Sequence, residues 1–285
     1  MKFFTIKLKE EFPFLKSKQE PTLTCYVNDN SRVLSVKRAN PAMLIAPGGG
    51  YANVSMCREG EQIAFSYLKE GFSCFVLDYS VNPETYPQQL MEIACAIHYI
   101  RKNATEWNID VNKVSVTGYS AGGHLAASLG VFWNDPFILD ALKLTGEDIR
   151  PDAMVLGYPV ISADSTFAHM GSIINVSGTT DANSPIFKKM SLENQVNENT
   201  PPTFLWHTAD DALVNVKNSL AFATALADNK VKFELHVYPF GYHGLATSDF
   251  ATNNFTEKHY TAPWMDESVK FLFDLWYNGK EYKTL

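Results

Sequence analysis

Hydrophobic and polar residues alternate in two short segments near the N-terminus, Phe3–Leu8 and Thr22–Val27. Alternation with a period of two is typical of strands that have one face on the core and the other in solvent. We therefore expect the two segments to pair as an antiparallel hairpin at the edge of a sheet.

Further along the chain, short apolar runs alternate with helical stretches, which is typical of parallel strands buried on both faces. The predicted order is strand Ala42–Ala46, helix Glu61–Glu70, strand Phe72–Leu77, helix Gln88–Lys102, strand Lys113–Thr117, helix Ala121–Val131, strand Ala153–Leu156, strand Thr203–His207, helix Val216–Ala227, strand Lys232–Tyr238 and helix Asp266–Tyr277. The predicted fold class is α/β, with a mostly parallel, doubly wound sheet and antiparallel N-terminal strands.

Residues 158–201, after the sixth predicted strand, are rich in Ser, Asn, Thr and Gly. The segment is too long for a plain connection in a compact domain. We expect a partly helical insertion that caps the strand ends. The chain has 285 residues, near the upper limit for one hydrophobic core, so residues 1–285 are predicted to form a single domain.

Charge and composition exclude several classes of protein. The net charge is −7 and the lysines and arginines are scattered, so we expect no nucleic-acid partner. No apolar run approaches the roughly 18 residues of a membrane span, and the mixed N-terminus lacks the apolar core of a secretory signal. We expect a cytoplasmic protein without membrane insertion, in which paired edge strands would be compatible with a homodimer.

The cysteines are widely spaced and form no CxxC pair, so neither a zinc site nor a disulfide framework is predicted. They are Cys25, Cys57, Cys74 and Cys95. Free cysteine is among the most buried residue types, and we expect buried thiols.

The segment with the clearest chemical meaning is Gly118-Tyr-Ser120-Ala-Gly122, which joins a buried strand to an Ala-rich helix. A Gly-x-Ser-x-Gly motif in that context holds its serine on a strained turn, clear of the sheet. The helix that follows points its first amides at the reacting centre. Ser120 is therefore the candidate nucleophile, against the alternative of a glycine-rich turn with an incidental serine.

A serine hydroxyl needs a base, and histidine has the pKa that suits this task near neutral pH. In this type of fold the order is Ser, then Asp or Glu, then His, which leaves His236, His243 and His259. His243 lies in a Gly-flanked loop directly after a strand, whereas His236 falls inside that strand and His259 in a polar region. His243 is the candidate base.

Two adjacent acids, Asp210 and Asp211, follow the strand before that one. We prefer Asp211 to orient the imidazole, because Val214 would anchor the loop and leave Asp211 at the tip of the turn. Asp210 is expected to act as a neighbour that caps the next helix.

Backbone amides for a negatively charged intermediate are expected where the strand before Pro47 ends in three glycines. Bare amides there can approach a substrate closely, and we assign Gly49, Gly50 and the amide of Ala121 to an oxyanion hole. A phosphate-binding loop is the alternative, but no Gly-Lys-Ser/Thr and no G-x-G-x-x-G with a distal acid follows.

Two further histidines have structural interpretations. His124, on the helix that follows Ser120, is expected to pack or to support the site rather than to act as the base. His207, beside Asp210 and Asp211, could suggest a metal site but more simply fills a core position. No metal is predicted.

These residues resemble the esterase/lipase branch of the α/β-hydrolases that includes bacterial acetyl xylan esterases and other carbohydrate esterases. The resemblance covers most of the chain and rests on the following segments: Pro47-Gly-Gly-Gly-Tyr51 in place of His-Gly-Gly-Gly, Asp78-Tyr-Ser-Val-Asn-Pro83 in place of Tyr-Arg-Leu-x-Pro, Gly118-Tyr-Ser-Ala-Gly-Gly-His-Leu-Ala126, and His207-Thr-Ala-Asp-Asp-Ala-Leu-Val-Asn215 in place of His-Gly-x-x-Asp-x-x-Val-Pro. The last segment favours Asp211 independently. Pro47 replaces a histidine that braces the oxyanion loop in relatives, and Asn215 replaces a proline.

The resemblance implies the α/β-hydrolase fold and hydrolysis of short acyl esters, often acetyl groups on sugars, without a cofactor. The expected partner is a small ester, and the expected route is an acyl-enzyme on Ser120. Tyr51, Tyr119 and the insertion are expected to bind substrate and to set acyl and alcohol preference.

Other functions stay open at this point. A peptidase of the same fold usually carries an additional gating domain, for which the chain leaves no room. An acyltransferase would use the same residues while excluding water. A binding protein on a disabled hydrolase scaffold would lack a member of the Ser-Asp-His set.

Overall fold

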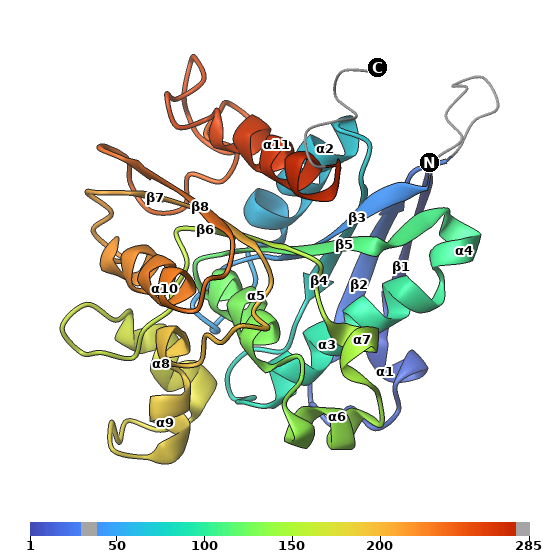
Figure 1. The fold of residues 1–285 in the computed structure, drawn as a ribbon, viewed down its shortest axis with the longest axis horizontal. Coiled ribbons are helices and arrows are strands. Elements are labelled where there is room, and N and C mark those ends of the chain that lie inside the picture. Colours follow the sequence, from blue (N-terminus) through green and yellow to red (C-terminus); the bar gives the residue numbers. More distant parts are fainter. Residues whose placement is uncertain (30–38, 278–285) are drawn as a thin grey trace.

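The computed structural model describes residues 1–29 and 39–277. These form one eight-stranded sheet with the order β1-β2-β4-β3-β5-β6-β7-β8 (Figure 1). The strands are β1 (Lys2–Lys7), β2 (Thr22–Val27), β3 (Asn40–Ala46), β4 (Ser73–Asp78), β5 (Ile109–Tyr119), β6 (Met154–Gly157), β7 (Thr203–Thr208) and β8 (Phe233–Tyr238).

The strand directions confirm the predicted fold class. β1 pairs with β2, and β2 with β4, in antiparallel fashion. Every other pairing in the sheet is parallel. The two N-terminal strands are not joined by a tight turn, because the helix α1 (Leu8–Glu11) and a loop lie between them. Of these two strands only β1 lies at an edge of the sheet, since β2 pairs with both β1 and β4; β8 forms the other edge.

Helices cover both faces of the sheet, because side chains along the buried strands alternate between two hydrophobic clusters. Leu44 and Val116 face one cluster, whereas Met43 and Ile45 face the other. The first cluster packs against the helices α3 (Gln88–Lys102), α5 (Ala121–Phe132) and α10 (Lys217–Asp228). The second packs against α2 (Gln62–Lys69) and α11 (Trp264–Tyr277), which lie together on the opposite side in Figure 1.

Several short elements were not predicted. They are α1, a π-helix (Met56–Glu61), α4 (Ala104–Trp107), α6 (Pro136–Leu142) and α7 (Gly146–Ile149). Most of them have only one turn, too short for a hydrophobic period to show. Local signals did exist for two of them: Asp135 caps α6 with Pro136 in its first turn, and Thr145 and Asp148 form a capping box at α7.

The insertion predicted after the sixth strand follows β6 and contains α8 (Met170–Ser177), α9 (Pro185–Lys189) and a 3₁₀ helix (Leu192–Asn194). It is anchored to the body of the protein: the amides of Ile161 and Ser162 both donate to Oδ1 of Asn218 on α10, at 2.9 and 3.0 Å. Whether this segment acts as a cap stays a prediction.

Candidate active site

Ser120 lies between the end of β5 and the start of α5, in a backbone conformation that is unusual for a residue with a side chain. Its φ and ψ are 54° and −121°. The turn is held in place because the Ser120 amide donates to Gly157 O at 3.1 Å and the Ser120 carbonyl accepts from Val160 N at 2.9 Å. Strain of this kind costs of order 1–3 kcal/mol and persists only where the surroundings impose it.

Glycines around Ser120 allow the close contacts that impose this turn. A Cβ on Gly118 would lie 2.1 Å from the carbonyl oxygen of Gly122, and a Cβ on Gly122 would lie 2.1 Å from Ala46 O. Real Cβ atoms do not approach backbone that closely. The packing of α5 against β3 and β5 therefore requires residues without side chains two positions before and two positions after Ser120.

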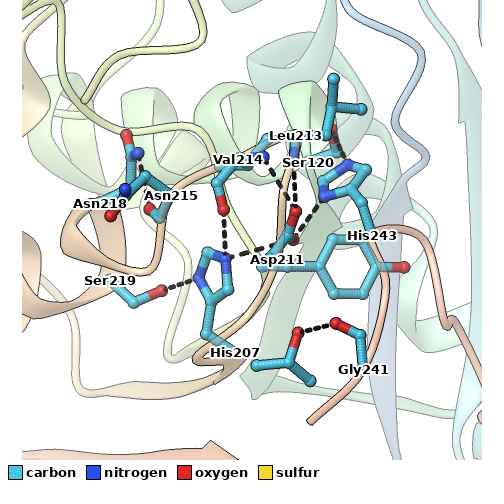
Figure 2. A network of polar contacts seen from close by, with 12 residues as sticks. Ser120, His207, Asp211, Leu213, Val214, Asn215, Asn218, Ser219, Gly241 and His243 are labelled. Carbon is cyan, nitrogen blue, oxygen red and sulfur yellow. Dashed lines mark hydrogen bonds and ion pairs between the residues drawn. The ribbon is translucent and has the colours of Figure 1, made fainter. Parts of the chain in front are cut away.

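His243 lies in the loop after β8 and contacts both other candidate residues. Its Nε2 is 2.8 Å from Ser120 Oγ, and its Nδ1 is 2.7 Å from Asp211 Oδ2 (Figure 2). A carboxylate only accepts hydrogen bonds, so Nδ1 carries the proton and Nε2 is left to accept from the Ser120 hydroxyl. The imidazole is mostly buried, with 14% of its side chain exposed.

Asp211 is held by hydrogen bonds on both oxygens. Oδ1 accepts from the amides of Leu213 and Val214, both at 2.9 Å, which fixes the loop after β7. Burial alone would raise the pKa of this carboxyl, but hydrogen bonds from His207, His243 and Val214 outweigh it and hold the pKa well below its usual range. Asp211 is therefore a carboxylate at neutral pH.

His207 is buried at the end of β7 and does more than fill a core position. Its Nδ1 lies 2.7 Å from Ser219 Oγ, and its Nε2 lies 2.9 Å from Val214 O and 3.4 Å from Asp211 Oδ2 (Figure 2). The imidazole thus connects α10 with the loop that carries Asp211.

The other acids and histidines that the sequence left open lie elsewhere. Asp210 does not cap a helix: its Oδ1 accepts from the Gly241 amide at 2.7 Å and so holds the loop that carries His243. His236 contacts Glu234 on its own strand, and His259 contacts Thr261.

The glycines after β3 form a loop beside Ser120. Gly49 and Gly50 have φ values of 135° and 67°, which favour glycine. Within the described residues, the amides of Gly49, Gly50 and Ala121 have no hydrogen-bond acceptor. Asn175 of α8 donates to Gly50 O at 2.8 Å, so the insertion contacts this loop directly.

The expected contact of Tyr51 and Tyr119 with substrate is not supported by their positions. Both side chains are fully buried. The Tyr51 hydroxyl lies 3.0 Å from His124 Nδ1, and the Tyr119 hydroxyl donates to Thr117 Oγ1 at 3.1 Å. Tyr119 belongs to the hydrophobic cluster on the face of the sheet opposite α5. We therefore assign both tyrosines to the packing that holds the loop and the turn.

His124 connects three parts of the site region. Besides meeting Tyr51, its Nε2 lies 3.0 Å from Met190 O in the insertion. Burial lowers the pKa of His124 to about 4, so the ring is neutral and cannot serve as a cation. This agrees with the expected supporting position of His124 on the helix that follows Ser120.

Two residues near the site had no signal in the sequence pattern. Glu59, in the π-helix, is buried and accepts from the Gly48 amide at 2.7 Å and from the Tyr158 hydroxyl at 2.7 Å. His169 caps α8, and burial together with the nearby charge of His243 lowers its pKa. Contacts of this kind join segments that are far apart in sequence, so spacing and periodicity do not predict them.

Within residues 1–29 and 39–277, no group of three or more His, Cys, Asp or Glu is arranged to hold a metal ion. No helix in the same ranges has both the length and the apolar composition needed to cross a bilayer. Cys25, Cys74 and Cys95 are buried as expected, whereas Cys57 is exposed on the π-helix, so the prediction was wrong for that residue.

Comparison with known proteins identifies relatives with the same architecture. The BD-FAE family matches residues 34–226. Endo-1,4-beta-xylanase B of Butyrivibrio fibrisolvens is 37% identical over 240 residues, which cover 80% of this chain and 35% of that protein. Acetylxylan esterase of Xylanibacter ruminicola is 28% identical over 246 residues, which cover 85% of this chain and 46% of that protein. The chain thus spans between a third and a half of the length of these curated relatives.

Solved structures resemble the chain over nearly its whole length. The acetyl ester-xyloside bifunctional hydrolase of Caldicellulosiruptor lactoaceticus is 34% identical with a TM-score of 0.80, and the match covers 95% of this chain and 96% of that one. The carboxylesterase Cest-2923 of Lactobacillus plantarum is 26% identical with a TM-score of 0.80, covering 96% and 98%. The protein belongs to the BD-FAE family, in the esterase branch of the α/β-hydrolase superfamily.

Proposed function

We propose that the protein is a serine carboxylesterase that hydrolyses short-chain acyl esters, above all acetyl esters of carbohydrates such as xylo-oligosaccharides. The observation that carries this proposal is the unbroken contact from Ser120 Oγ through His243 to Asp211, at 2.8 and 2.7 Å. A base within hydrogen-bond reach of the nucleophile, itself oriented by a third group, is the arrangement that activates a hydroxyl.

In the acylation step, Ser120 Oγ attacks the ester carbonyl carbon while His243 Nε2 takes up the hydroxyl proton. The imidazole becomes positively charged, and the Asp211 carboxylate stabilises that charge and holds the ring in the required tautomer. His243 then gives the proton to the alcohol oxygen as the C–O bond breaks. An acyl group remains on Ser120.

The negative charge on the carbonyl oxygen needs donors, and we assign the amides of Gly49, Gly50 and Ala121 to that task. The absence of an acceptor for these amides in the described part of the chain supports the assignment. The N-terminus of α5 adds a positive potential at the same place. Donors of this kind lower the barrier by about 3 kcal/mol each.

In the deacylation step, His243 takes a proton from water, and the resulting hydroxide attacks the acyl carbonyl. The C–O bond to Ser120 breaks, the proton returns to Ser120 Oγ, and the acid leaves. The chain's own side chains and amides supply every group in this cycle, and we propose no cofactor.

The alcohol half of the ester is expected to lie in a hollow lined by His243 and in a second one that shares Tyr242 with it. One, of about 660 Å³, is lined by Asp210, Ala212, Leu213, Gly241, Tyr242 and His243. The second, of about 470 Å³, includes Tyr242, Phe250 and Phe255. Tyr242 is 51% exposed and Phe250 is 81% exposed, and such aromatic faces suit the apolar face of a sugar ring.

The names of the relatives agree with this substrate class: one is an acetylxylan esterase and another is an acetyl ester-xyloside bifunctional hydrolase. The contact among Ser120, Asp211 and His243 argues against a disabled scaffold. The predicted cytoplasmic location and a homodimer stay predictions.

The proposal is tested by measuring acetate release from acetylated xylo-oligosaccharides, beside p-nitrophenyl acetate and longer-chain nitrophenyl esters. We expect release from both acetylated substrates, and a fall of at least ~10³-fold in Ser120→Ala. Activity confined to the nitrophenyl esters would retain the esterase and remove the sugar assignment. Faster acyl transfer to an added alcohol than to water would favour an acyltransferase.

A further inference from the structure

One buried acid that the proposed chemistry does not use connects the glycine loop with His243. Glu59 Oε2 accepts from the Gly48 amide at 2.7 Å, and Oε1 accepts from the Tyr158 hydroxyl at 2.7 Å. The Tyr158 ring in turn packs edge-on against the His243 ring, with centroids 5.0 Å apart. A single carboxyl group therefore contacts the loop directly and the imidazole through one aromatic ring.

The directions of these hydrogen bonds indicate an ionised Glu59. The Tyr158 hydroxyl accepts from the Ala246 amide at 3.1 Å, so its own proton is directed to Glu59 Oε1. The Gly48 amide can only donate. Both carboxyl oxygens therefore accept. Burial raises the pKa of Glu59 above its usual value, and the hydrogen bonds from Tyr158 and Gly48 together with the charges of His243 and Arg58 offset only part of that rise. The assignment of a negative charge therefore rests on the two oxygens that both accept hydrogen bonds.

The fit around Glu59 leaves little freedom for the loop. A Cβ on Gly48 would lie 2.6 Å from Glu59 Oε2 and 2.9 Å from the Cβ of Ser120. The acid is carried by a π-helix, an element that is rare and is often found at functional sites. Tyr158 has a φ of 35°, a further sign that this region is built to a fixed geometry.

We propose that Glu59 is a positioning residue that sets the glycine loop and His243 relative to each other, and whose negative charge favours the charged imidazole formed during the reaction. The inference rests on the proposed esterase function. It assigns to Glu59 a second carboxylate role beside Asp211, which Glu59 exerts through the Tyr158 ring rather than by direct contact with the imidazole.

The charge part of the proposal concerns several groups around His243. Titratable and charged groups face the imidazole or its neighbours from several elements. They are His207 on β7, Asp210 and Asp211 after β7, Glu59 and Arg58 on the π-helix, Tyr158 after β6 and His169 at α8. Replacing Glu59 by Gln removes one negative charge and leaves the others in place. Protonation of the imidazole then becomes less favourable, so the acidic limb of the kcat/KM profile moves to lower pH.

The experiment compares wild type, Glu59→Gln, Tyr158→Phe and Glu92→Gln on p-nitrophenyl acetate between pH 5 and 9, with thermal melts of each. Glu92 is the matched control: it is fully buried and accepts from Ser80 N and Ser80 Oγ at 2.7 and 2.6 Å, but contacts neither the glycine loop nor His243.

We expect Glu59→Gln to lower kcat by about 10- to 100-fold, with KM nearly unchanged and the acidic limb at lower pH. Tyr158→Phe keeps the ring but loses its anchor and should give a smaller fall in kcat. Glu92→Gln should lower the melting temperature while leaving kcat and the acidic limb as in wild type.

A folded Glu59→Gln variant with the kcat and pH profile of wild type would overturn the inference, as would the same changes in Glu92→Gln. If Glu59→Gln does not fold, an unchanged kcat in Tyr158→Phe overturns it instead. A wild-type protein without Ser120-dependent hydrolysis contradicts the esterase function itself and removes the inference with it.

Discussion

His207 places its Nε2 3.4 Å from Oδ2 of Asp211, with both side chains fully buried. The same nitrogen lies 2.9 Å from Val214 O. Since the amide of Val214 also donates to Asp211, the histidine closes the loop that presents the acid to His243. The orientation of Asp211 thus depends on a residue that has no contact with the nucleophile.

Replacing His207 by Leu should therefore affect both stability and turnover. It leaves Val214 O without a donor and frees the Asp211 loop, so we expect a loss of about 1–3 kcal/mol in unfolding free energy. We also expect a fall of about 10-fold in kcat with little change in KM. Urea unfolding and steady-state kinetics check this. His236→Leu is the control, because His236 lies on β8 outside the network and should leave kcat unchanged.

Burial of His124 predicts a pH dependence of stability. The pKa of this imidazole is lowered from 6.5 to about 4, because burial penalises the charged form. Between these values the unfolded chain binds a proton that the folded protein does not, so this residue's contribution to stability falls as the pH falls from 6.5 to 4.

The expected loss from His124 is about 3 kcal/mol over that range. Urea unfolding of wild type and His124→Gln at several pH values isolates it, since the other titrating groups are common to both proteins. The stability difference between them should shrink or reverse toward pH 4. Parallel curves would show that His124 does not titrate in this way.

Two glycine-to-alanine substitutions, one beside the Ser120 turn and one on α8, are expected to have opposite effects on stability. Gly122→Ala would place a Cβ 2.1 Å from Ala46 O and 2.3 Å from Pro47 O, so we expect loss of the native turn and of activity. Gly171→Ala, in α8, would meet His169 at an ordinary 3.6 Å and should be neutral or stabilising by about 0.5–1 kcal/mol. Thermal melts and p-nitrophenyl acetate turnover measure both. A stable, active Gly122→Ala would contradict the close packing described here.

The exposed aromatic side chains of Tyr242 and Phe250, the aromatic rim of the hollows near His243, are expected to affect one class of substrate more than another. Phe250→Ala and Tyr242→Ala should lower kcat/KM for acetylated xylo-oligosaccharides by about 5- to 30-fold, the loss of roughly 1–2 kcal/mol of ring contact. Hydrolysis of p-nitrophenyl acetate should change little. Phe137→Ala serves as control because Phe137 is similarly exposed, at 57%, but lies on α6. Equal losses on both substrates would argue against a sugar subsite at the rim.

The long elements of the fold could be predicted because their patterns are unambiguous. The helix predicted over Gln88–Lys102 is α3 with the same bounds, and the buried runs after Asn40 became parallel strands in the expected order. β5 extends four residues before its predicted start, to Ile109, because that stretch has half-exposed polar positions and reads as a loop. One-turn helices such as α4 carry too few residues for a period to show.

The candidate site could be predicted only as far as motifs and chain order reach. Ser120 was predicted from the Gly-x-Ser-x-Gly motif, and Asp211 and His243 were predicted from the chain order Ser, Asp, His and from their positions in loops after strands. The structure brings the three side chains together. Tyr119, next to Ser120, was misjudged because successive residues of a strand point to opposite faces, and its ring enters the other core. Glu59 was missed because its partners lie in the glycine loop and beyond β6, which only the folded chain brings together.

The most direct test of the central claim is covalent labelling with a fluorophosphonate probe, followed by mass spectrometry of the labelled peptide. We expect stoichiometric modification of Ser120 in wild type, none in Ser120→Ala, and labelling at least ~10²-fold slower in His243→Ala. Labelling at another residue, or at the same rate in His243→Ala, would contradict the assignment of Ser120 and His243 as nucleophile and base.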